Sequence, residues 1–183
     1  MKVIASPLPG VCVVEPNVFG DHRGFFMESY QQQRYMDNGI ETVFVQDNIS
    51  LSVRNTLRGL HYQYPRGQAK LVQVLQGEIF DVVVDIRKGS PTWGQWFGVT
   101  LSSDNNRQVF IPEGYAHGFC VTSETALFAY KCSDYYLPED EGGVRWDDPH
   151  IGIQWPVKSP ILSDCDKNYA GLDAIPAERL PVY

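Results

Sequence analysis

Residues 70–86 read KLVQVLQGEIFDVVVDI, and this stretch decides the class of fold. It holds two runs rich in valine, leucine and isoleucine, Lys70–Leu75 and Ile79–Ile86, and such runs are typical of β-strands. Gln76 and Gly77 separate the runs at the length of a β-hairpin connection, so we predict a tight turn between them. The stretch therefore predicts two successive strands.

Similar short runs, bounded by turn residues, recur on both sides of this stretch. They are Val11–Val14, Val43–Asn48, Leu57–Gln63, Gly94–Leu101, Gln108–Ile111, Phe119–Val121 and Ala126–Lys131. One helix is expected at Glu28–Asn38, because Gly39 follows at the position where a helix commonly ends. Many short strands at nearly regular spacing are typical of an antiparallel β-sandwich or jelly roll. We therefore predict a mainly β jelly roll with few short helices.

The 183 residues correspond to the usual size of one domain. No internal repeat, low-complexity tract or flexible linker divides the sequence. From about residue 136 onward the chain is rich in Pro, Gly, Asp and Trp and has few strand-like runs. We expect residues 1–183 to form a single domain in which residues 136–183 are an ordered tail. Trp146 and Trp155 are expected to help this tail wrap the barrel.

The net charge of −7 argues against binding to nucleic acid and against docking on an anionic membrane surface. A local basic cluster would still allow a small anion to bind. The sequence has no run of 18 apolar residues and no apolar run near Met1 typical of a signal peptide, so we expect a cytoplasmic protein. The cysteines show no CxxC pair, which favours reduced thiols over a disulfide framework or a zinc ribbon. They are Cys12, Cys120, Cys132 and Cys165.

The segment Leu57–Gln63 is the densest polar and aromatic stretch of the chain. Alternate residues of a strand share a face, so Gly59, His61 and Gln63 are expected to point the same way. Polar groups on an inward face each need a hydrogen-bond partner. His61 is therefore either a structural histidine with a satisfied ring or a chemically active one, and the local pattern leaves both open.

An inward histidine in a small β-barrel raises the possibility of a metal-binding cupin. Such a site typically uses two histidines at alternate strand positions, a nearby glutamate and a third histidine later in the chain. Here the position two after His61 is Gln63, a weak ligand, and His117 supplies only the later histidine. The pattern therefore disfavours a metal site.

Without a metal, His61 can act as a general base, because the pKa of a free histidine of ~6.5 suits proton transfer near neutral pH. Tyr130 is a candidate acid, Lys70 a candidate cation beside a developing oxyanion, and Asp166 a candidate partner that orients a histidine. Arg23 has the planar guanidinium that suits a phosphate. Each also has a plain structural alternative, such as a packed aromatic ring, a solvated strand end or a surface salt bridge.

Together, the ordered blocks of this sequence resemble the dTDP-4-dehydrorhamnose 3,5-epimerase family. The blocks are FGDHRGFFME at 19–28, QDN at 46–48, LRGLHYQ at 57–63, KLV at 70–72, FDVVVDIR at 80–87, SPTWG at 90–94, IPEGYAHGF at 111–119, YKC at 130–132 and WDDP at 146–149. The resemblance runs from about Val11 to Leu172. It implies a cupin-type jelly roll that has lost the metal, an enzyme without a cofactor, and a homodimer in which an amino-terminal segment helps to form the partner's site.

The resemblance also implies an activity. The family converts dTDP-4-dehydro-6-deoxy-α-D-glucose to dTDP-4-dehydro-β-L-rhamnose, on the way to the dTDP-L-rhamnose of cell-surface polysaccharides. By the same resemblance His61 is the base, Asp166 its carboxylate partner, Tyr130 the acid on the opposite face, and Lys70 the cation near the ketone oxygen. The positions that it assigns to substrate binding are Arg23, Glu28, Gln46, Asn48, Arg58, His117, Tyr136 and Glu141, with Tyr136 stacking near the thymine.

Two features depart from a simple match. Cys165 stands where the family commonly has a lysine, which puts one contact to the nucleotide sugar in doubt. Regular strand alternation places Arg58 on the face opposite His61, although the resemblance places both beside the ligand. A bulge at Gly59 would reconcile the two positions.

Three other functions remain open. An epimerase that acts at only C3 or only C5 would use the same His61 and Tyr130. The other two alternatives are a metal-dependent cupin oxygenase or isomerase and a sugar-nucleotide binding module without catalysis.

Overall fold

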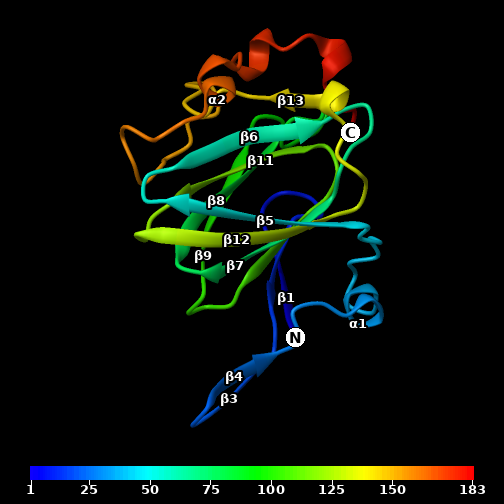
Figure 1. Ribbon diagram of the computed structural model, residues 1–183. Coiled ribbons are helices and arrows are strands. Elements are labelled where there is room, and N and C mark those ends of the chain that lie inside the picture. Colours follow the sequence, from blue (N-terminus) through cyan, green and yellow to red (C-terminus); the bar gives the residue numbers. More distant parts are fainter.

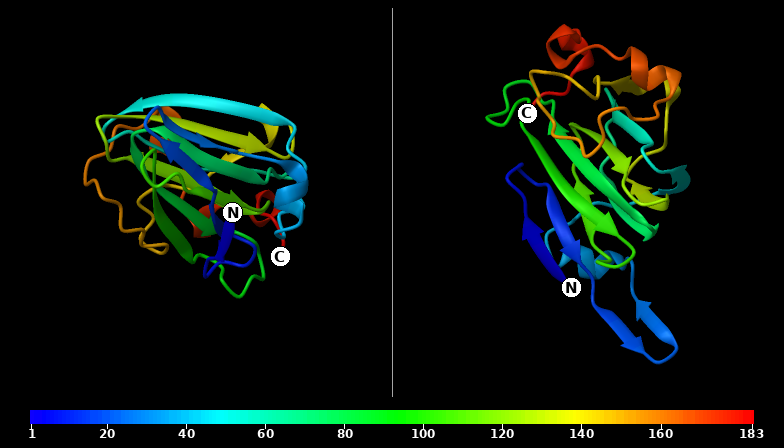
Figure 2. Two further views of the ribbon diagram at one scale, coloured as in Figure 1. Left: turned by 90° about the horizontal axis from the view of Figure 1, so that it is seen from below. Right: turned by 90° about the vertical axis from the view of Figure 1, so that its left-hand side faces the viewer.

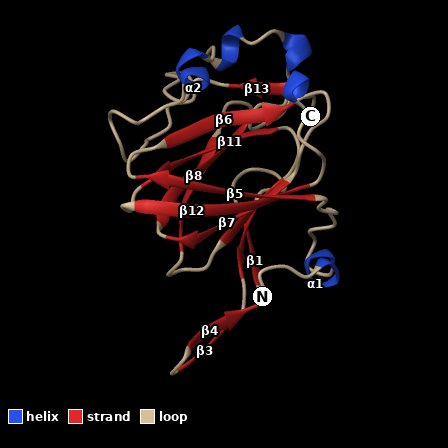
Figure 3. Ribbon diagram, viewed as in Figure 1, coloured by secondary structure: helices blue, strands red, loops and turns tan.

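The computed structural model describes residues 1–183 as two antiparallel β-sheets packed against each other (Figure 1). The six-stranded sheet contains, in order across it, β1 (Lys2–Ala5), β2 (Cys12–Glu15), β10 (Gln108–Ile111), β7 (Lys70–Gln76), β12 (Thr125–Cys132) and β5 (Gln46–Val53). The five-stranded sheet contains β13 (Glu141–Gly143), β6 (Leu57–Gln63), β11 (Tyr115–Val121), β8 (Glu78–Asp85) and β9 (Trp96–Ser102). Strands dominate the chain and helices are few and short (Figure 3), which confirms the predicted mainly β jelly roll.

The tight turn between β7 and β8 is confirmed, but it joins strands of different sheets. Gly77 alone separates them, with φ at +84°. A Cβ at this position would lie 2.1 Å from the Thr125 carbonyl oxygen, so only glycine fits. β7 pairs with β10 and β12, whereas β8 pairs with β11 and β9. The turn is therefore a corner of the sandwich, because each strand forms its ladder with partners remote in sequence.

The main core lies between the two sheets and consists of 15 buried residues. Val72 and Val109 reach it from the six-stranded sheet, and Val83 and Phe119 reach it from the five-stranded sheet. Burial of a valine or phenylalanine side chain contributes about 1.5–3 kcal/mol. This core holds the two sheets in the relative position that forms the cavity described below.

Several element bounds differ from the predictions. β11 begins at Tyr115 and not at Phe119, because every residue from Tyr115 to Val121 has a ladder partner on β8. β5 extends to Val53, since its alternate apolar side chains face outward and hide the strand pattern. The predicted helix Glu28–Asn38 is only α1 (Gln32–Met36), where extended Gln31 caps the amino end and Gly39 follows with φ at +88°.

Two further strands, β3 (Val18–Asp21) and β4 (Gly24–Met27), form a hairpin that sequence analysis did not predict. The hairpin pairs with no other strand and projects away from both sheets (Figure 1). Three of its large side chains, Phe19, Phe25 and Phe26, are 64%, 60% and 70% exposed. Exposed phenylalanines on a projecting hairpin are typical of a surface that binds another molecule.

Residues 136–183 contain β13, the short helix α2 (Asp164–Asn168) and three 3₁₀ turns. The later part of this segment lies over the five-stranded sheet on the side away from the main core (Figure 2). A second apolar cluster joins the two: Val144, Ile151 and Leu172 from the segment pack with Leu60 and Val82 of the sheet. This packing places α2 beside β6. No helix in the structure has the length and apolar composition needed to cross a membrane.

Candidate active site

The candidate site is a cavity between the two sheets, made of two adjoining hollows. The large hollow has a volume of about 330 Å³ and the small hollow about 220 Å³. His61 on β6, Lys70 on β7 and Tyr130 on β12 line both of them. The large hollow is also lined by Gln46, Asn48, Tyr62, Gln63, Gln68, Tyr136 and Glu141. The small hollow is also lined by Ile49, Ser50, Arg58, His117, Gly118, Phe119 and Phe128. Side chains from both sheets therefore meet at one cavity.

His61 is paired with Asp166 of α2, at 2.6 Å between Nε2 and Oδ1. Burial raises the pKa of Asp166. The hydrogen bond and charge of His61, together with Ser163 and the Gly59 backbone, lower this pKa by more, so the net value lies below the ordinary pKa of an aspartate. Asp166 therefore stays ionised and accepts the Nε2 proton. This fixes the tautomer, and Nδ1 of His61 is then the nitrogen that can take a proton.

Tyr130 approaches the cavity from the opposite sheet. Burial raises the pKa of Tyr130, and the charge of Arg58 opposes this effect. The hydroxyl is consequently protonated near neutral pH and can act as a proton donor. Lys70 Nζ lies 6.0 Å from the centre of the Tyr130 ring. Burial lowers the pKa of Lys70. Lys70 takes part in no ion pair, so its amine is free to interact with a negative charge that develops on a ligand.

A second histidine–aspartate pair borders the small hollow. His117 on β11 lies 2.8 Å from Asp81 on β8, measured between Nε2 and Oδ2. The side chains are 8% and 0% exposed. The His117 ring also stacks on Phe128, with 6.1 Å between ring centroids. His117 was a predicted binding residue, whereas its pairing with Asp81 was not predicted from the sequence.

The bulge predicted at Gly59 is confirmed. β6 pairs with β11 at His61–His117 and at Arg58–Phe119, so β6 has one residue more than β11 between these points. Gly59 has φ at +123°. The extra residue reverses the alternation, and Arg58 therefore lines the small hollow together with His61. Arg58 Nε donates a hydrogen bond of 3.0 Å to the hydroxyl of Ser52.

Gln46, Asn48, Tyr136 and Glu141 come together at the large hollow. The Tyr136 hydroxyl donates to Glu141 at 2.6 Å, and Gln46 accepts from the Tyr136 backbone N–H at 3.2 Å. Gln46 Nε2 in turn donates to the side-chain Oδ1 of Asn48 at 3.1 Å. The hydrogen bond to Glu141 raises the pKa of Tyr136 to about 12. Tyr136 is 47% exposed, so its ring can stack with a planar group at the cavity mouth.

Arg23 and Glu28 lie outside the cavity of this chain. Arg23 is at the tip of the β3–β4 hairpin and pairs with Asp21 at 2.6 Å, with its side chain 78% exposed. Glu28 follows the hairpin and pairs with Arg34 at 2.7 Å. Within one chain, therefore, the structure does not bring these two predicted residues to the others.

The late loop shows the consequence of Cys165. Cys165 is exposed on α2, directly before Asp166, and lines neither hollow. Neighbouring Lys167 pairs with Asp164 at 2.9 Å on the exposed side of the same helix. The residue at 165 therefore contributes no positive charge, and Lys167 is engaged elsewhere.

Two residues near His61 were not predicted as site residues. The ring of Tyr169 lies 5.8 Å from that of His61 in an edge-on arrangement. Gln63 is 8% exposed, lines the large hollow and has an Oε1 without a protein partner. The signal for Gln63 was its spacing of two from His61. Tyr169 carried no signal beyond its position near Asp166. The structure contains no group of three His, Cys, Asp or Glu side chains that could hold a metal ion.

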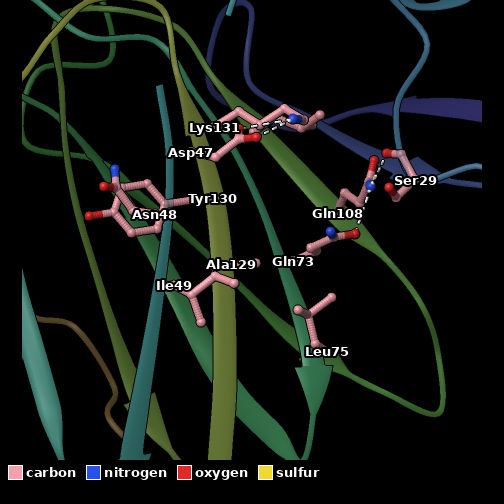
Figure 4. Close-up of a pocket in the computed structure, with 11 residues that line it drawn as sticks. Ser29, Asp47, Asn48, Ile49, Gln73, Leu75, Gln108, Ala129, Tyr130 and Lys131 are labelled. Atoms are coloured by element: carbon pink, nitrogen blue, oxygen red, sulfur yellow. Dashed lines mark hydrogen bonds and ion pairs between the residues drawn. The ribbon is translucent and has the colours of Figure 1, made fainter. Parts of the chain in front are cut away.

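A further hollow of about 300 Å³ lies on the outer face of the six-stranded sheet (Figure 4). Asp47 and Lys131 form an ion pair of 2.9 Å across its rim. Gln108 donates to Gln73 and to the Ser29 carbonyl. These polar groups already have partners, and the hollow holds no histidine. Its one carboxylate, Asp47, is engaged by Lys131, so the cavity between the sheets remains the candidate site.

Comparison with known proteins agrees with this geometry. A sequence model described as dTDP-4-dehydrorhamnose 3,5-epimerase matches residues 5–174. The dTDP-4-dehydrorhamnose 3,5-epimerase of Salmonella typhimurium is 56% identical over 169 residues, which cover 91% of this chain and 92% of that protein. The dTDP-4-dehydrorhamnose 3-epimerase of Streptomyces niveus is 41% identical over 186 residues, which cover 100% of this chain and 90% of that protein.

A solved structure is similar over the whole chain. It is the dTDP-6-deoxy-D-glucose-3,5-epimerase of Legionella pneumophila, in complex with dTDP-4-keto-L-rhamnose. It has a TM-score of 0.97 and 52% sequence identity, and the match covers 100% of this chain and 98% of that one. The matches of sequence and structure thus extend over the same residues that form the two sheets and the cavity. The chain belongs to the dTDP-4-dehydrorhamnose 3,5-epimerase family, whose members are isomerases of nucleotide sugars.

Proposed function

We propose that this chain converts dTDP-4-dehydro-6-deoxy-α-D-glucose to dTDP-4-dehydro-β-L-rhamnose by epimerisation at C3 and C5, as a step of dTDP-L-rhamnose biosynthesis. One observation carries the proposal: His61, paired with Asp166, and Tyr130 line one cavity from opposite sheets. A base and an acid on opposite sides of a bound sugar ring are what inversion at carbon requires. The relatives named for epimerisation at both carbons support the two-carbon reaction.

The mechanism follows from the acidity of a C–H bond next to a ketone, whose anion is delocalised onto the oxygen as an enolate. Nδ1 of His61 removes the proton, and Lys70 stabilises the enolate oxygen, a contribution of about 10²–10³ in rate. Tyr130 then returns a proton to the carbon from the other side, and each acid–base step contributes about 10²–10⁴. C3 and C5 both adjoin the C4 ketone, so one set of groups serves both carbons. The reaction has no net oxidation and needs no redox cofactor.

Substrate binding is assigned along the cavity. Tyr136, with Gln46, Asn48 and Glu141, is assigned to the nucleoside end, because its exposed ring can stack on the thymine. Arg58 and His117 are assigned to the anionic and polar parts of the ligand. A diphosphate is thus bound by a local group of cations, although the whole chain has a net charge of −7.

Arg23 and Glu28 are assigned to the partner's site in a homodimer. The projecting β3–β4 hairpin and its exposed phenylalanines support this assignment. Apolar side chains also cover the outer face of β5, where Ile49, Leu51 and Val53 are 67%, 64% and 55% exposed. A second copy of the chain would remove both surfaces from water.

We also propose a single domain over residues 1–183, with residues 136–183 as its ordered tail, and a cytoplasmic location. The apolar cluster shared by the tail and the five-stranded sheet supports the first proposal. The second is supported by the cysteines, which are all free although three of them are buried.

Deuterium incorporation from D₂O tests the proposed reaction. We expect label at both C3 and C5 of the nucleotide sugar, followed by mass spectrometry or proton NMR. Label at one carbon only, however long the incubation, would identify a single-carbon epimerase like the Streptomyces niveus relative. His61→Ala should abolish exchange. His150→Ala is the matched control, because it removes a histidine paired with Asp173 at 2.7 Å on the surface and should leave exchange unchanged.

Mixing two inactive variants tests the assignment of Arg23. Arg23→Ala lacks the hairpin cation and His61→Ala lacks the base, so each homodimer is expected to have little activity. In a mixed dimer one of the two sites regains both residues, and an equal mixture should recover about a quarter of the wild-type activity. Absence of recovery in subunits shown to exchange would contradict the shared site.

A further inference from the structure

The Asp81 carboxylate is buried to an unusual degree for a charged group. It lies in the middle of β8 with 0% exposure, and only Oδ2 has a partner, the Nε2 of His117 at 2.8 Å. Oδ1 has no hydrogen-bonding protein atom within reach. Leaving an acceptor of a buried carboxylate unpaired costs free energy. A neutral asparagine could orient the same ring at lower cost, so the retained charge calls for a role of its own.

The surroundings of His117 indicate what that role is. The other titratable side chains around the small hollow are Arg58 and His61 of β6, Lys70 of β7 and Tyr130 of β12. Three of these are basic, and no carboxylate lines the hollow. Asp81, paired with the His117 ring, therefore places a carboxylate next to this basic group from β8 of the five-stranded sheet. Its charge also reaches Lys70: burial lowers the pKa of Lys70, and the charges of Asp81 and Glu141 oppose that effect.

Ring geometry adds a second constraint. Asp81 binds Nε2, while Phe128 stacks on the face of the ring at an interplanar angle of 23°. With Nε2 occupied, Nδ1 is the nitrogen left for a ligand. Phe128 restricts rotation of the His117 ring, and the Asp81 carboxylate fixes which ring nitrogen faces away from the cavity. The ring is consequently held in one orientation before any ligand arrives.

From these contacts we propose that Asp81 is a positioning residue for the epimerase reaction: its buried carboxylate holds His117 with Nδ1 toward the cavity, where the ring can hydrogen-bond to the nucleotide sugar. Asp81 does not touch the substrate and acts through His117. The inference rests on the proposed function, because it takes the nucleotide sugar as the ligand. It extends that function by adding a residue outside the cavity lining to the binding machinery.

Asp81→Asn is the direct test, since the amide oxygen can still accept the Nε2 proton while the charge is lost. Hydrogen bonds with an ionised partner are roughly twice as strong as neutral ones, so we expect the Kd for dTDP to rise about tenfold. Calorimetric titration with dTDP measures this value. A Kd and kcat equal to those of the wild type would overturn the proposal. Ser102→Ala, on the neighbouring strand β9, controls for loss of a buried polar group: its hydroxyl accepts only from the Asn105 backbone N–H and does not contact His117.

A double-mutant cycle separates action through His117 from a structural role. In the His117→Asn background, Asp81→Asn should change the dTDP affinity by less than twofold. An equal loss in both backgrounds would mean that Asp81 acts independently of His117 and would overturn the proposal. If Asp81→Asn fails to fold, Asp81→Glu provides the second variant. It keeps the charge but displaces the ring, so weakened dTDP binding at an unchanged melting temperature is expected, and wild-type affinity would contradict the proposal.

Deuterium exchange tests the proposed function separately from the role of Asp81. If the wild type exchanges both carbons and binds dTDP, but Asp81→Asn binds equally well, only the role of Asp81 is wrong. If the wild type neither exchanges nor binds dTDP, the proposed function is wrong, and the role of Asp81 is overturned with it.

Discussion

Replacing Asp166 by asparagine should remove most of the catalytic rate while leaving the fold intact. The side chain has the same size, and Asp166 lies 2.6 Å from His61 Nε2 with its own side chain only 4% exposed. The change removes the negative charge that accepts the Nε2 proton. An amide can also turn its NH₂ toward Nε2, which would place the ring proton on Nδ1 and eliminate the base.

The magnitude follows from what the pair supplies. General-base catalysis by a correctly held histidine contributes about 10²–10⁴ in rate, which corresponds to about 3–5 kcal/mol in the activation free energy. The tautomer set by Asp166 is a condition for that contribution, so kcat should fall by about the same factor. Affinity for dTDP should change little, because no part of the assigned nucleotide contacts involves Asp166.

Deuterium exchange at saturating nucleotide sugar measures kcat, and thermal melting checks the fold. Asp164→Asn is the control within the same helix: its side chain is 95% exposed and its ion pair with Lys167 lies at the surface, so both kcat and stability should stay near wild type. A kcat for Asp166→Asn within about threefold of the wild type would refute the assignment of the His61 pair as the base, since general-base loss should cost far more.

Three further predictions concern the fold and the acid. Gly59→Ala should lower the free energy of unfolding by more than about 2 kcal/mol in urea, because its φ is +123° and its Cβ would lie 2.6 Å from the Gly118 Cα; a smaller loss would contradict the bulge. Asp85→Asn should cost about 3–5 kcal/mol by removing the 2.6 Å pair with Arg87. Burial raises the pKa of Asp85, but the hydrogen bonds from Arg87 and the neighbouring hydroxyls outweigh burial and leave this pKa below its ordinary value. Its stabilisation is therefore present above the unfolded pKa of about 4 and lost as the pH falls through the folded value, so the variant should lose less stability on acidification than the wild type. Tyr130→Phe should keep the melting temperature and lower kcat about 10²–10⁴-fold; unchanged exchange would exclude the hydroxyl as the acid.

Strand positions could be predicted from the sequence better than strand partners. The valine and isoleucine runs at 70–76 and 78–85 mark β7 and β8 because β-branched residues suit the buried pleated surface. Their assignment to different sheets could not be predicted, because pairing depends on contacts with β12 and β11, remote in sequence. The β3–β4 hairpin was missed for a related reason: its phenylalanines have no buried face within one chain.

The candidate site shows the same division. The bulge at Gly59 could be predicted, since two expectations for Arg58 and His61 conflicted and a glycine lay between them. The pairing of His61 with Asp166, 105 residues apart, came from family resemblance and not from any local pattern. A role for Asp81 could not be predicted, because a single carboxylate at an alternate position of an apolar strand is typical of a solvent-facing residue. Only the place of β8 inside the five-stranded sheet, between β11 and β9, shows that it is buried.

The two histidine–aspartate pairs differ in how their carboxylates are held, and the difference fits the two proposed roles. Asp166 receives hydrogen bonds from Ser163 and the Gly59 backbone as well as from His61, so its charge is stabilised without the ring. His61 can therefore gain and lose a proton at Nδ1 while its partner stays unchanged, as a base must. Asp81 has no hydrogen-bond partner other than His117. A fully buried carboxylate whose one partner is a ring nitrogen ties that ring to one orientation, which suits a group that holds a binding residue in place.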